Sequence, residues 1–334
     1  MPFRKKMDTQ LAIDALVKGD FVLVFDVFST GLLLLKALKQ FLDKKHNQNT
    51  FIEQRDFRSE YNRLSNRLLI SVSNHQLKAK KSPEIGWFKL LYPDLTEFLL
   101  PFPKVQGLNS AWQWYKKGIS IPVLNQKVYP YYDTYFPTRF EHLVLFDMWL
   151  TSHSKSIKTA FDIGVGSGVL SYQLAKHGVD TIIATDINPN AIIGMQNAQI
   201  TSNLELRFGN LFADCDDLVD LIVFNPPWVP ATHHLKGIDN AIYYDANLFP
   251  DFFKDAKKHL KSNGRIVLLF SNLAQVSNVT SENPIEQELL KNNRFEKDIL
   301  LTDTVVKASK HTKRNQNWRK DELVELWVLK LKEN

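Results

Sequence analysis

Apolar and polar residues follow a repeating pattern over the second half of the chain. From about residue 159, short apolar runs typical of buried strands alternate with segments whose apolar residues recur every three or four positions, as in amphipathic helices. Strands are expected at residues 160–163, 181–185, 204–208, 218–224 and 265–271. Helices are expected from about residue 168 and over residues 190–199 and 250–260, the last ended by Asn263 and Gly264. The alternation predicts an α/β fold with a mostly parallel sheet covered by helices.

Two further apolar runs lie near the end of the chain, at residues 298–306 and 323–331. They flank a polar segment, so we expect them to pair as an antiparallel hairpin beside the parallel strands. The predicted sheet therefore has seven strands.

The first third of the chain has a different pattern. Alternation over residues 21–25 predicts a strand, and residues 30–42 place Leu, Ala and Phe on one face of a predicted helix. A segment with two glycines, two prolines and several aromatic residues, 106–130, separates this region from the sheet. We therefore expect a smaller N-terminal domain, residues 1–110, and a larger domain, residues 111–334.

Charge is unevenly distributed between these two regions. Residues 1–110 carry 17 Lys and Arg against 11 Asp and Glu, a net charge of +6, whereas the remainder is neutral. Within the remainder, residues 307–320 hold six Lys and Arg and no acid. The two basic segments either meet a polyanion such as RNA or are solvated surfaces.

Composition sets further bounds. Cys215 is the single cysteine, so no internal disulfide forms, and the most apolar stretch, residues 21–42, is interrupted by Asp26, Lys36 and Lys39. A membrane-spanning helix needs about 20 nearly uncharged residues. We therefore expect a cytoplasmic protein without a membrane segment.

A metal site is not expected from the sequence. His233 and His234 are adjacent residues in a predicted loop. Two such residues rarely ligate a metal without further ligands.

Three glycines stand where the first predicted strand gives way to a helix. Asp162 is followed by Gly164, Gly166 and Gly168 at alternate positions. Glycine lets the backbone turn tightly and leaves it bare, so that a ligand can lie directly against it. The G-x-G-x-G spacing, followed by Val169, departs from the G-x-G-x-x-G pattern of dinucleotide-binding enzymes.

The ends of the next two strands complete the expected cofactor site. Asp186 ends the second strand, 18 residues after Gly168, where a carboxylate can accept hydrogen bonds from both hydroxyls of a ribose. As an alternative, Asp186 caps the helix that follows. Asn210, just after the third strand, is expected to bind an adenine amino group, with Ile187 and Leu211 packed against the ring. A plain turn asparagine is the alternative.

Asn225, Pro226, Pro227 and Trp228 directly follow the fourth predicted strand. This position is the carboxyl edge of the sheet, where open α/β folds bind their ligands. The Asn225 side-chain oxygen and the Pro226 carbonyl are two acceptors that can hold both hydrogens of a planar NH2 group, and Trp228 offers a flat face against that group. Because orientation lowers the barrier to reaction, the tetrad is the predicted catalytic group.

In this order, the glycine turn, Asp186, Asn210 and the tetrad resemble the N-methyltransferases that carry an Asn-Pro-Pro-aromatic motif, over about residues 111–334. This superfamily includes amino-type adenine and cytosine methylases and the HemK-like glutamine methylases of translation release factors. The resemblance implies a seven-stranded Rossmann-like methyltransferase sheet that binds S-adenosylmethionine and presents a planar nitrogen for methylation. Trp228 replaces the Tyr typical of HemK-like enzymes, and Asn210 stands where many relatives carry Asp.

HemK-like enzymes also place an aromatic-rich hairpin and a proline-containing substrate loop ahead of the glycine motif. Residues 112–130 and the loop 136–141 resemble that arrangement. The resemblance makes Phe136, Thr138 and Arg139 candidate substrate residues.

Two of these candidates have other interpretations, and Tyr244 is a further candidate. Thr138 and Glu141 are spaced as a capping box for the helix that follows, and Arg139 is placed to close over the carboxylate of the cofactor. Tyr244, after the tetrad, is either a lid residue that contacts substrate or a packed aromatic.

The acceptor of the methyl group stays open at this level. A protein glutamine is favoured by the hairpin and loop before the glycine motif. A base in RNA or DNA is favoured by the basic N-terminal domain and residues 307–320. A small-molecule N-methyltransferase, a nicotinamide oxidoreductase and a silent cofactor-binding module are the remaining interpretations.

Overall fold

The chain divides into two compact units, Met1–Lys116 and Lys117–Asn334. The computed structural model describes residues 1–198, 203–213, 215–231, 242–305, 319 and 321–332. The division falls a few residues beyond residue 110, because helix α5 (Phe102–Lys117) continues through this segment. On that helix Trp112 and Tyr115 pack against Trp87. These aromatic residues therefore lie on a helix, and the aromatic-rich hairpin implied by the resemblance is wrong for them.

Residues 1–116 form a small α/β unit. Its other elements are β1 (Pro2–Phe3), α1 (Thr9–Lys18), β2 (Val22–Val24), α2 (Phe28–Asp43), α3 (Phe51–Ser65), β3 (Leu68–Ser73), β4 (Gln76–Leu77), α4 (Trp87–Leu91) and β5 (Glu97–Pro101). Strands β1, β2 and β3 are parallel neighbours, and β3 also pairs antiparallel with β4 and β5. The strand and helix expected near the start of the chain are confirmed as β2 and α2.

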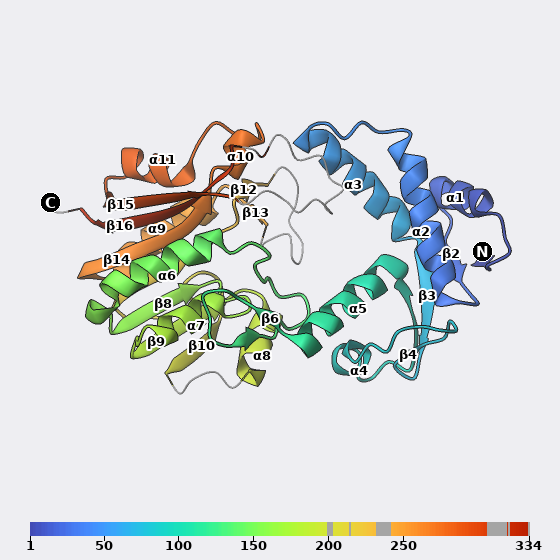
Figure 1. Cartoon of the computed structure of the whole chain (residues 1–334), viewed down its shortest axis with the longest axis horizontal. Coiled ribbons are helices and arrows are strands. Elements are labelled where there is room, and N and C mark those ends of the chain that lie inside the picture. Colours follow the sequence, from blue (N-terminus) through green and yellow to red (C-terminus); the bar gives the residue numbers. More distant parts are fainter. Residues whose placement is uncertain (199–202, 214, 232–241, 306–318, 320, 333–334) are drawn as a thin grey trace. The chain divides into compact units, whose positions relative to one another are not determined.

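The second unit is built on a seven-stranded sheet, as expected. Its elements are β6 (Ile119–Ser120), β7 (Lys127–Val128), α6 (Glu141–His153), the 3-10 helix η1 (Ser154–Ser156), β8 (Thr159–Ile163), α7 (Val169–Lys176), β9 (Thr181–Asp186), α8 (Pro189–Asn197), β10 (Leu204–Phe208), β11 (Val219–Phe224), β12 (Val229–Pro230), β13 (Tyr243–Tyr244), α9 (Leu248–His259), β14 (Leu260–Ser271), α10 (Leu273–Val276), α11 (Pro284–Lys291), β15 (Phe295–Thr304) and β16 (Leu323–Leu331). The strand order is β10-β9-β8-β11-β14-β16-β15, in which β16 runs antiparallel to both neighbours (Figure 1).

Side chains on this sheet alternate between two hydrophobic cores. On β11, Leu221 and Val223 pack with residues of α6 and α7, whereas Ile222 and Phe224 pack with residues of α9 and α11. Coverage of both faces explains why the strands read as nearly continuous apolar runs. It also leaves the carboxyl edge of the sheet as the place where loop residues gather.

Two local predictions about helix ends are wrong. Asn263 and Gly264 do not stop a helix, because α9 ends at His259 and β14 starts at once. The register with β11 shifts between Leu260 and Arg265, so Asn263 and Gly264 lie in an irregularity of the strand. Thr138 does not cap α6: the cap is Phe140, whose N–H donates to the Glu141 carboxylate at 3.0 Å.

No helix in the described part of the chain is long and apolar enough to cross a membrane. Likewise, the described residues contain no group of three or more His, Cys, Asp or Glu side chains arranged to hold a metal ion. His233, His234 and all of the basic segment 307–320 except Arg319 lie outside the described residues.

Candidate active site

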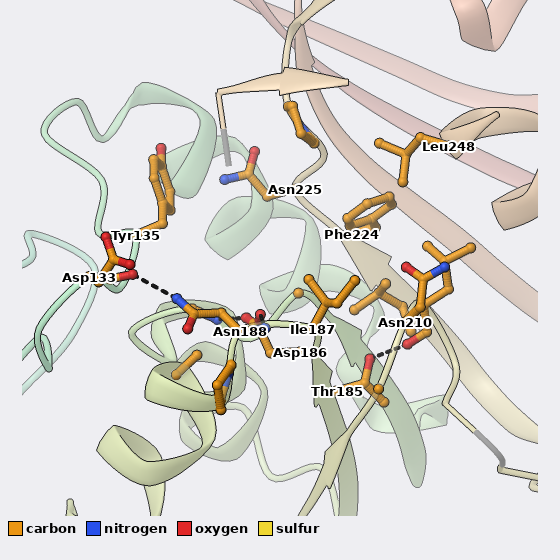
Figure 2. Close-up of a pocket in the computed structure, with 18 residues that line it drawn as sticks. Asp133, Tyr135, Thr185, Asp186, Ile187, Asn188, Asn210, Phe224, Asn225 and Leu248 are labelled. Carbon is orange, nitrogen blue, oxygen red and sulfur yellow. Dashed lines mark hydrogen bonds between the residues drawn. The ribbon is translucent and has the colours of Figure 1, made fainter. Parts of the chain in front are cut away.

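A cavity of about 300 Å³ opens at the carboxyl ends of β8, β9, β10 and β11 (Figure 2). Loops that leave four neighbouring parallel strands meet there, as expected for a ligand site in an open α/β sheet. Its lining combines bare backbone, two carboxylates, amides and apolar side chains. The lining residues are Asp133, Tyr135, Ile163, Gly164, Gly166, Thr185, Asp186, Ile187, Asn188, Pro189, Ala191, Gly209, Asn210, Leu211, Phe224, Asn225, Pro227 and Leu248.

The glycine turn between β8 and α7 requires glycine at three places. Gly164, Gly166 and Gly168 have φ values of 70°, 52° and 80°, in the left-handed region that other residues rarely adopt. A Cβ on Gly166 would lie 3.1 Å from the carbonyl oxygen of Tyr135. Gly164 and Gly166 line the cavity, whereas Gly168 caps α7.

Asp186 joins this turn to the end of β9. One carboxylate oxygen accepts the Gly166 N–H at 2.8 Å, and the other accepts the Asn188 N–H at 2.7 Å. Helix α8 is capped by Asn188, whose side chain accepts the Asn190 N–H, so Asp186 is not the cap. Burial raises the pKa of Asp186, and the two N–H donors oppose that shift. Each oxygen keeps a further lone pair for a hydroxyl on the cavity side.

The side of the cavity at β9 and β10 is largely apolar. Ile187 and Leu211 line it together with Asn210. Leu211 has a φ of 48°, and its carbonyl accepts the Thr185 hydroxyl.

Asn225 follows β11 and lines another part of the cavity. Its Oδ1 is buried and has no hydrogen-bond partner among the described residues. Burial raises the pKa of Tyr135, and a hydrogen bond with the Asn225 side chain lowers it in part. An orphaned buried carbonyl oxygen is costly, so it is typical of a site that binds a donor.

The rest of the tetrad is held firmly. Pro226 and Pro227 are buried, and Pro227 lines the cavity. The indole N–H of Trp228 donates to the carbonyl of Leu269 at 3.1 Å, and the ring meets His142 edge-on, with centroids 5.4 Å apart. These two contacts fix the orientation of the Trp228 ring.

Asp162 is fully buried on β8, two residues before the glycine turn. One oxygen accepts the Ser171 hydroxyl at 2.6 Å, and the other has no partner among the described residues. Burial raises the pKa of Asp162 to about 7, and the charge of Asp186 adds to the shift. The carboxyl supports the turn from within the fold and does not line the cavity.

Residues 147–296 match the family model described as a methyltransferase small domain. Over 125 residues the chain is 30% identical to a protein of Methanocaldococcus jannaschii that is described, provisionally, as a protein N5-glutamine methyltransferase; the match covers 35% of this chain and 63% of that protein. Over 139 residues it is 30% identical to the release factor glutamine methyltransferase of Streptococcus pneumoniae. That match covers 37% of this chain and 50% of the relative. The chain thus spans about half the length of these curated relatives.

Solved structures that match part of the chain were also found. The ribosomal protein L11 methylase of Lactobacillus delbrueckii subsp. bulgaricus is 21% identical and has a TM-score of 0.38, covering 57% of this chain and 78% of its own. Trm5b of Pyrococcus abyssi is 14% identical and has a TM-score of 0.40. The match covers 63% of this chain and 57% of the Trm5b chain.

The candidate substrate residues lie away from the cavity lining. Arg139 pairs with the buried carboxylate of Glu322 at 3.6 Å, so its guanidinium is directed to a structural partner. Thr138 is exposed and Phe136 is half-buried. Tyr244 lies on β13, beside the strand that follows Trp228, and packs edge-on against Phe249.

Ten lining residues were not singled out from the sequence. Seven of them lie at or within five residues of the end of a strand, so that position was the available signal: Ile163, Thr185, Asn188, Pro189, Ala191, Gly209 and Phe224. Asp133, Tyr135 and Leu248 come from the loop before α6 and the start of α9, and no local pattern marks them. The Tyr135 carbonyl accepts the Ser167 N–H at 3.0 Å, which ties that loop to the glycine turn.

Proposed function

We propose that this chain is an S-adenosylmethionine-dependent N-methyltransferase that acts on the side-chain amide of a protein glutamine. The observation that carries the proposal is the buried, unpartnered Oδ1 of Asn225 beside a cavity lined by the glycine turn and Asp186.

The cavity residues fit the cofactor. The bare backbone at Gly164 and Gly166 leaves room for its amino-acid part, and Asp186 has lone pairs for the two ribose hydroxyls. Ile187 and Leu211 suit the faces of an adenine ring, and Asn210 suits its amino group. When bound, S-adenosylmethionine supplies a methyl group on a positively charged sulfur.

The tetrad would orient the acceptor nitrogen. Asn225 Oδ1 and the Pro226 carbonyl accept its two hydrogens, and Trp228 packs against the planar group. The methyl group would replace one hydrogen of the nitrogen that Asn225 and Pro226 hold, and that hydrogen would leave as a proton to solvent. Holding the nitrogen in line contributes up to about 7–11 kcal/mol to lowering the barrier.

Glutamine is favoured as the acceptor because the two relatives are described as glutamine methyltransferases. A base in RNA or DNA is the second candidate, favoured by the net charge of +6 on residues 1–110. Both acceptors present a planar NH2 group, so the tetrad suits either one.

The test is transfer of tritiated methyl from labelled cofactor into a fractionated cell extract. Label that protease releases and RNase does not, located by mass spectrometry on a glutamine, supports the proposal. Label that RNase releases identifies a base instead. If calorimetry detects neither S-adenosylmethionine nor S-adenosylhomocysteine bound to folded protein, the proposal fails.

A variant of Asn225 tests the proposed role of the tetrad. Asn225→Ala should lower methyl transfer at least about 100-fold, the loss typical of one positioned hydrogen-bonding group. Cofactor affinity should stay within about twofold. The matched control is Asn203→Ala, at the opposite edge of the same sheet, where the side chain donates to the Val179 carbonyl at 2.7 Å. If Asn225→Ala transfers methyl as the parent does, the tetrad is not the catalytic group.

A further inference from the structure

The sheet of the unit Met1–Lys116 has one covered and one open face. Residues that alternate along β2 and β3, namely Val22, Val24, Leu68 and Ile70, are buried. The residues between them point the other way, because successive side chains of a strand face opposite sides. We call this second surface the open sheet face: Phe21, Leu23, Phe25, Leu69 and Leu99.

Register brings the open sheet face together. Leu23 pairs with Leu69, and Ser71 on the same strand pairs with Leu99. Phe21 and Phe25 stand at either end of β2, and their side chains are 57% and 54% exposed. Two phenylalanines this exposed, on the same side of one strand, are unusual for a surface that meets only water.

An arginine side chain lies close to the ring of each of these phenylalanines. The Arg4 guanidinium lies 4.7 Å from the centroid of Phe25, and that of Arg67 lies 5.8 Å from the centroid of Phe21. Two exposed lysines, Lys5 and Lys6, follow Arg4 in the chain.

Two acids adjoin the same strand. Asp20 is exposed, and Asp26 accepts hydrogen bonds from the N–H groups of Lys5 and Val27 and from the Thr30 hydroxyl. The Lys5 hydrogen bond is the main cause of the lowered pKa of Asp26. The immediate surroundings are therefore net positive, in keeping with the charge of +6 on residues 1–110.

Flat apolar rings beside guanidinium groups match single-stranded nucleic acid better than an apolar protein surface. Bases of any sequence stack on aromatic rings, and arginines pair with the adjoining phosphates. One N–H group of Arg67 donates to the Gly19 carbonyl. An apolar partner would strip water from the Arg4 guanidinium and from the other N–H groups of Arg67 without replacing those hydrogen bonds.

We propose that the open sheet face binds single-stranded nucleic acid, with bases stacked on Phe21 and Phe25 and phosphates held by Arg4 and Arg67. This activity goes beyond the proposed methyl transfer and holds for either methyl acceptor. It assigns a role to a region that the family match at residues 147–296 does not include.

The experiment measures fluorescence anisotropy of a labelled 12-nucleotide oligouridylate with the full chain, at low and moderate salt. An oligothymidylate of equal length distinguishes RNA from DNA. Phe21→Ala with Phe25→Ala should weaken binding at least about tenfold, since stacking contributes about 1–3 kcal/mol per base. Arg4→Ala with Arg67→Ala should weaken binding and reduce its salt dependence, because fewer counterions are released.

The controls change similar residues elsewhere in the same unit. Leu11→Ala with Leu90→Ala removes two apolar side chains of similar exposure, 59% and 53%, from α1 and α4. Lys36→Ala with Lys39→Ala removes two exposed charges from α2. Both control variants should bind the oligonucleotides as the parent does.

Three results would overturn the proposal. They are no binding of either oligonucleotide at low salt, equal binding by the double phenylalanine variant, or equal losses in the controls. If the double phenylalanine variant binds oligonucleotide as the parent does but no longer self-associates, the open sheet face binds a second copy of the chain instead. Cofactor binding and methyl transfer are measured on the same variants, so a failure of the proposed enzyme activity is seen separately.

Discussion

Asp162 and His142 are buried ionisable residues whose pKa values move in opposite directions for the same reason. Burial raises the pKa of Asp162 from 3.8 to about 7 and lowers that of His142 from 6.5 to about 4. The fold therefore favours the neutral form of each. As pH rises from about 4 to 7, the unfolded chain loses the Asp162 proton before the folded chain does, so stability falls. As pH drops below 6.5, the unfolded chain gains a proton on His142 before the folded chain does, so stability falls in that direction also.

Asp162→Asn should remove the first of these losses. Asparagine does not ionise and still accepts the Ser171 hydroxyl, so the free energy of unfolding of the variant, relative to the parent, should increase between pH 5 and pH 8 by about 2–3 kcal/mol. Denaturant titrations at the two pH values without cofactor measure this. His142 is unchanged in both proteins and cancels. Parallel pH profiles for parent and variant would contradict the expected result.

Trp228 contributes both a hydrogen bond and a flat face, and two variants separate them. Phenylalanine and leucine both lack the N–H that Leu269 accepts, but only phenylalanine keeps a planar ring. Trp228→Phe should therefore retain about tenfold more methyl transfer than Trp228→Leu, in line with the energy of an aromatic stack. Cofactor affinity should be similar in both. Equal rates in the two variants would show that the ring does not stack on the acceptor.

At the scale of elements, the turn from β8 to α7 does most to shape the cavity. Its glycines adopt positive φ, and its N–H groups are fixed by Asp186 from β9 and by Tyr135 from a distant loop. The conformation of the turn between β8 and α7 therefore depends on two residues, Asp186 and Tyr135, that lie outside this segment of the sequence. The site should be sensitive to backbone changes here.

Two glycines offer a matched test of this turn. Gly166 and Gly178 both have positive φ, of 52° and 81°, but a Cβ on Gly178 meets nothing within 4 Å. Alanine at either position should cost about 1–2 kcal/mol of unfolding free energy because of backbone strain. Gly166→Ala should in addition weaken S-adenosylhomocysteine binding at least about tenfold, as measured by calorimetry, whereas Gly178→Ala should not. Similar affinities in the two variants would exclude the turn from the cofactor site.

At the scale of the whole molecule, the cavity belongs to one unit. Every lining residue lies within Lys117–Asn334, while Met1–Lys116 has its own sheet and buried residues. The proposed cofactor and nucleic-acid sites therefore lie on separately folded parts of the chain. A ligand that binds one unit should slow hydrogen exchange mainly in that unit.

Hydrogen–deuterium exchange tests this division. Saturating S-adenosylhomocysteine should slow exchange in peptides that contain Gly166, Asp186 and Asn225, because a bound ligand lowers the population of locally open states. Peptides from Met1–Lys116 should be unchanged. Equal protection in both units would contradict a cofactor site confined to the second one.

Much of the sheet was predictable because its signals are local. Period-two and period-3.6 patterns, glycine at a strand-to-helix turn and polar residues after strands depend on neighbours in sequence. Residues 160–163, 181–185 and 204–208 accordingly form strands close to their expected bounds. The helix end at Asn263 and Gly264 failed because Leu260 and Arg265, on either side of them, both pair with β11, which leaves the two residues in an irregularity of the strand.

The sequence by itself determined which segments form the strands and which residues follow their carboxyl ends, including Gly164, Asp186 and Asn225, since each follows from a local pattern. Only the tertiary structure decided that Tyr135 and Leu248 join them around one cavity, and that Arg139 turns to Glu322 instead. Those placements depend on packing between segments far apart in the chain, where the energy of burial and hydrogen bonding selects a partner that no local pattern specifies.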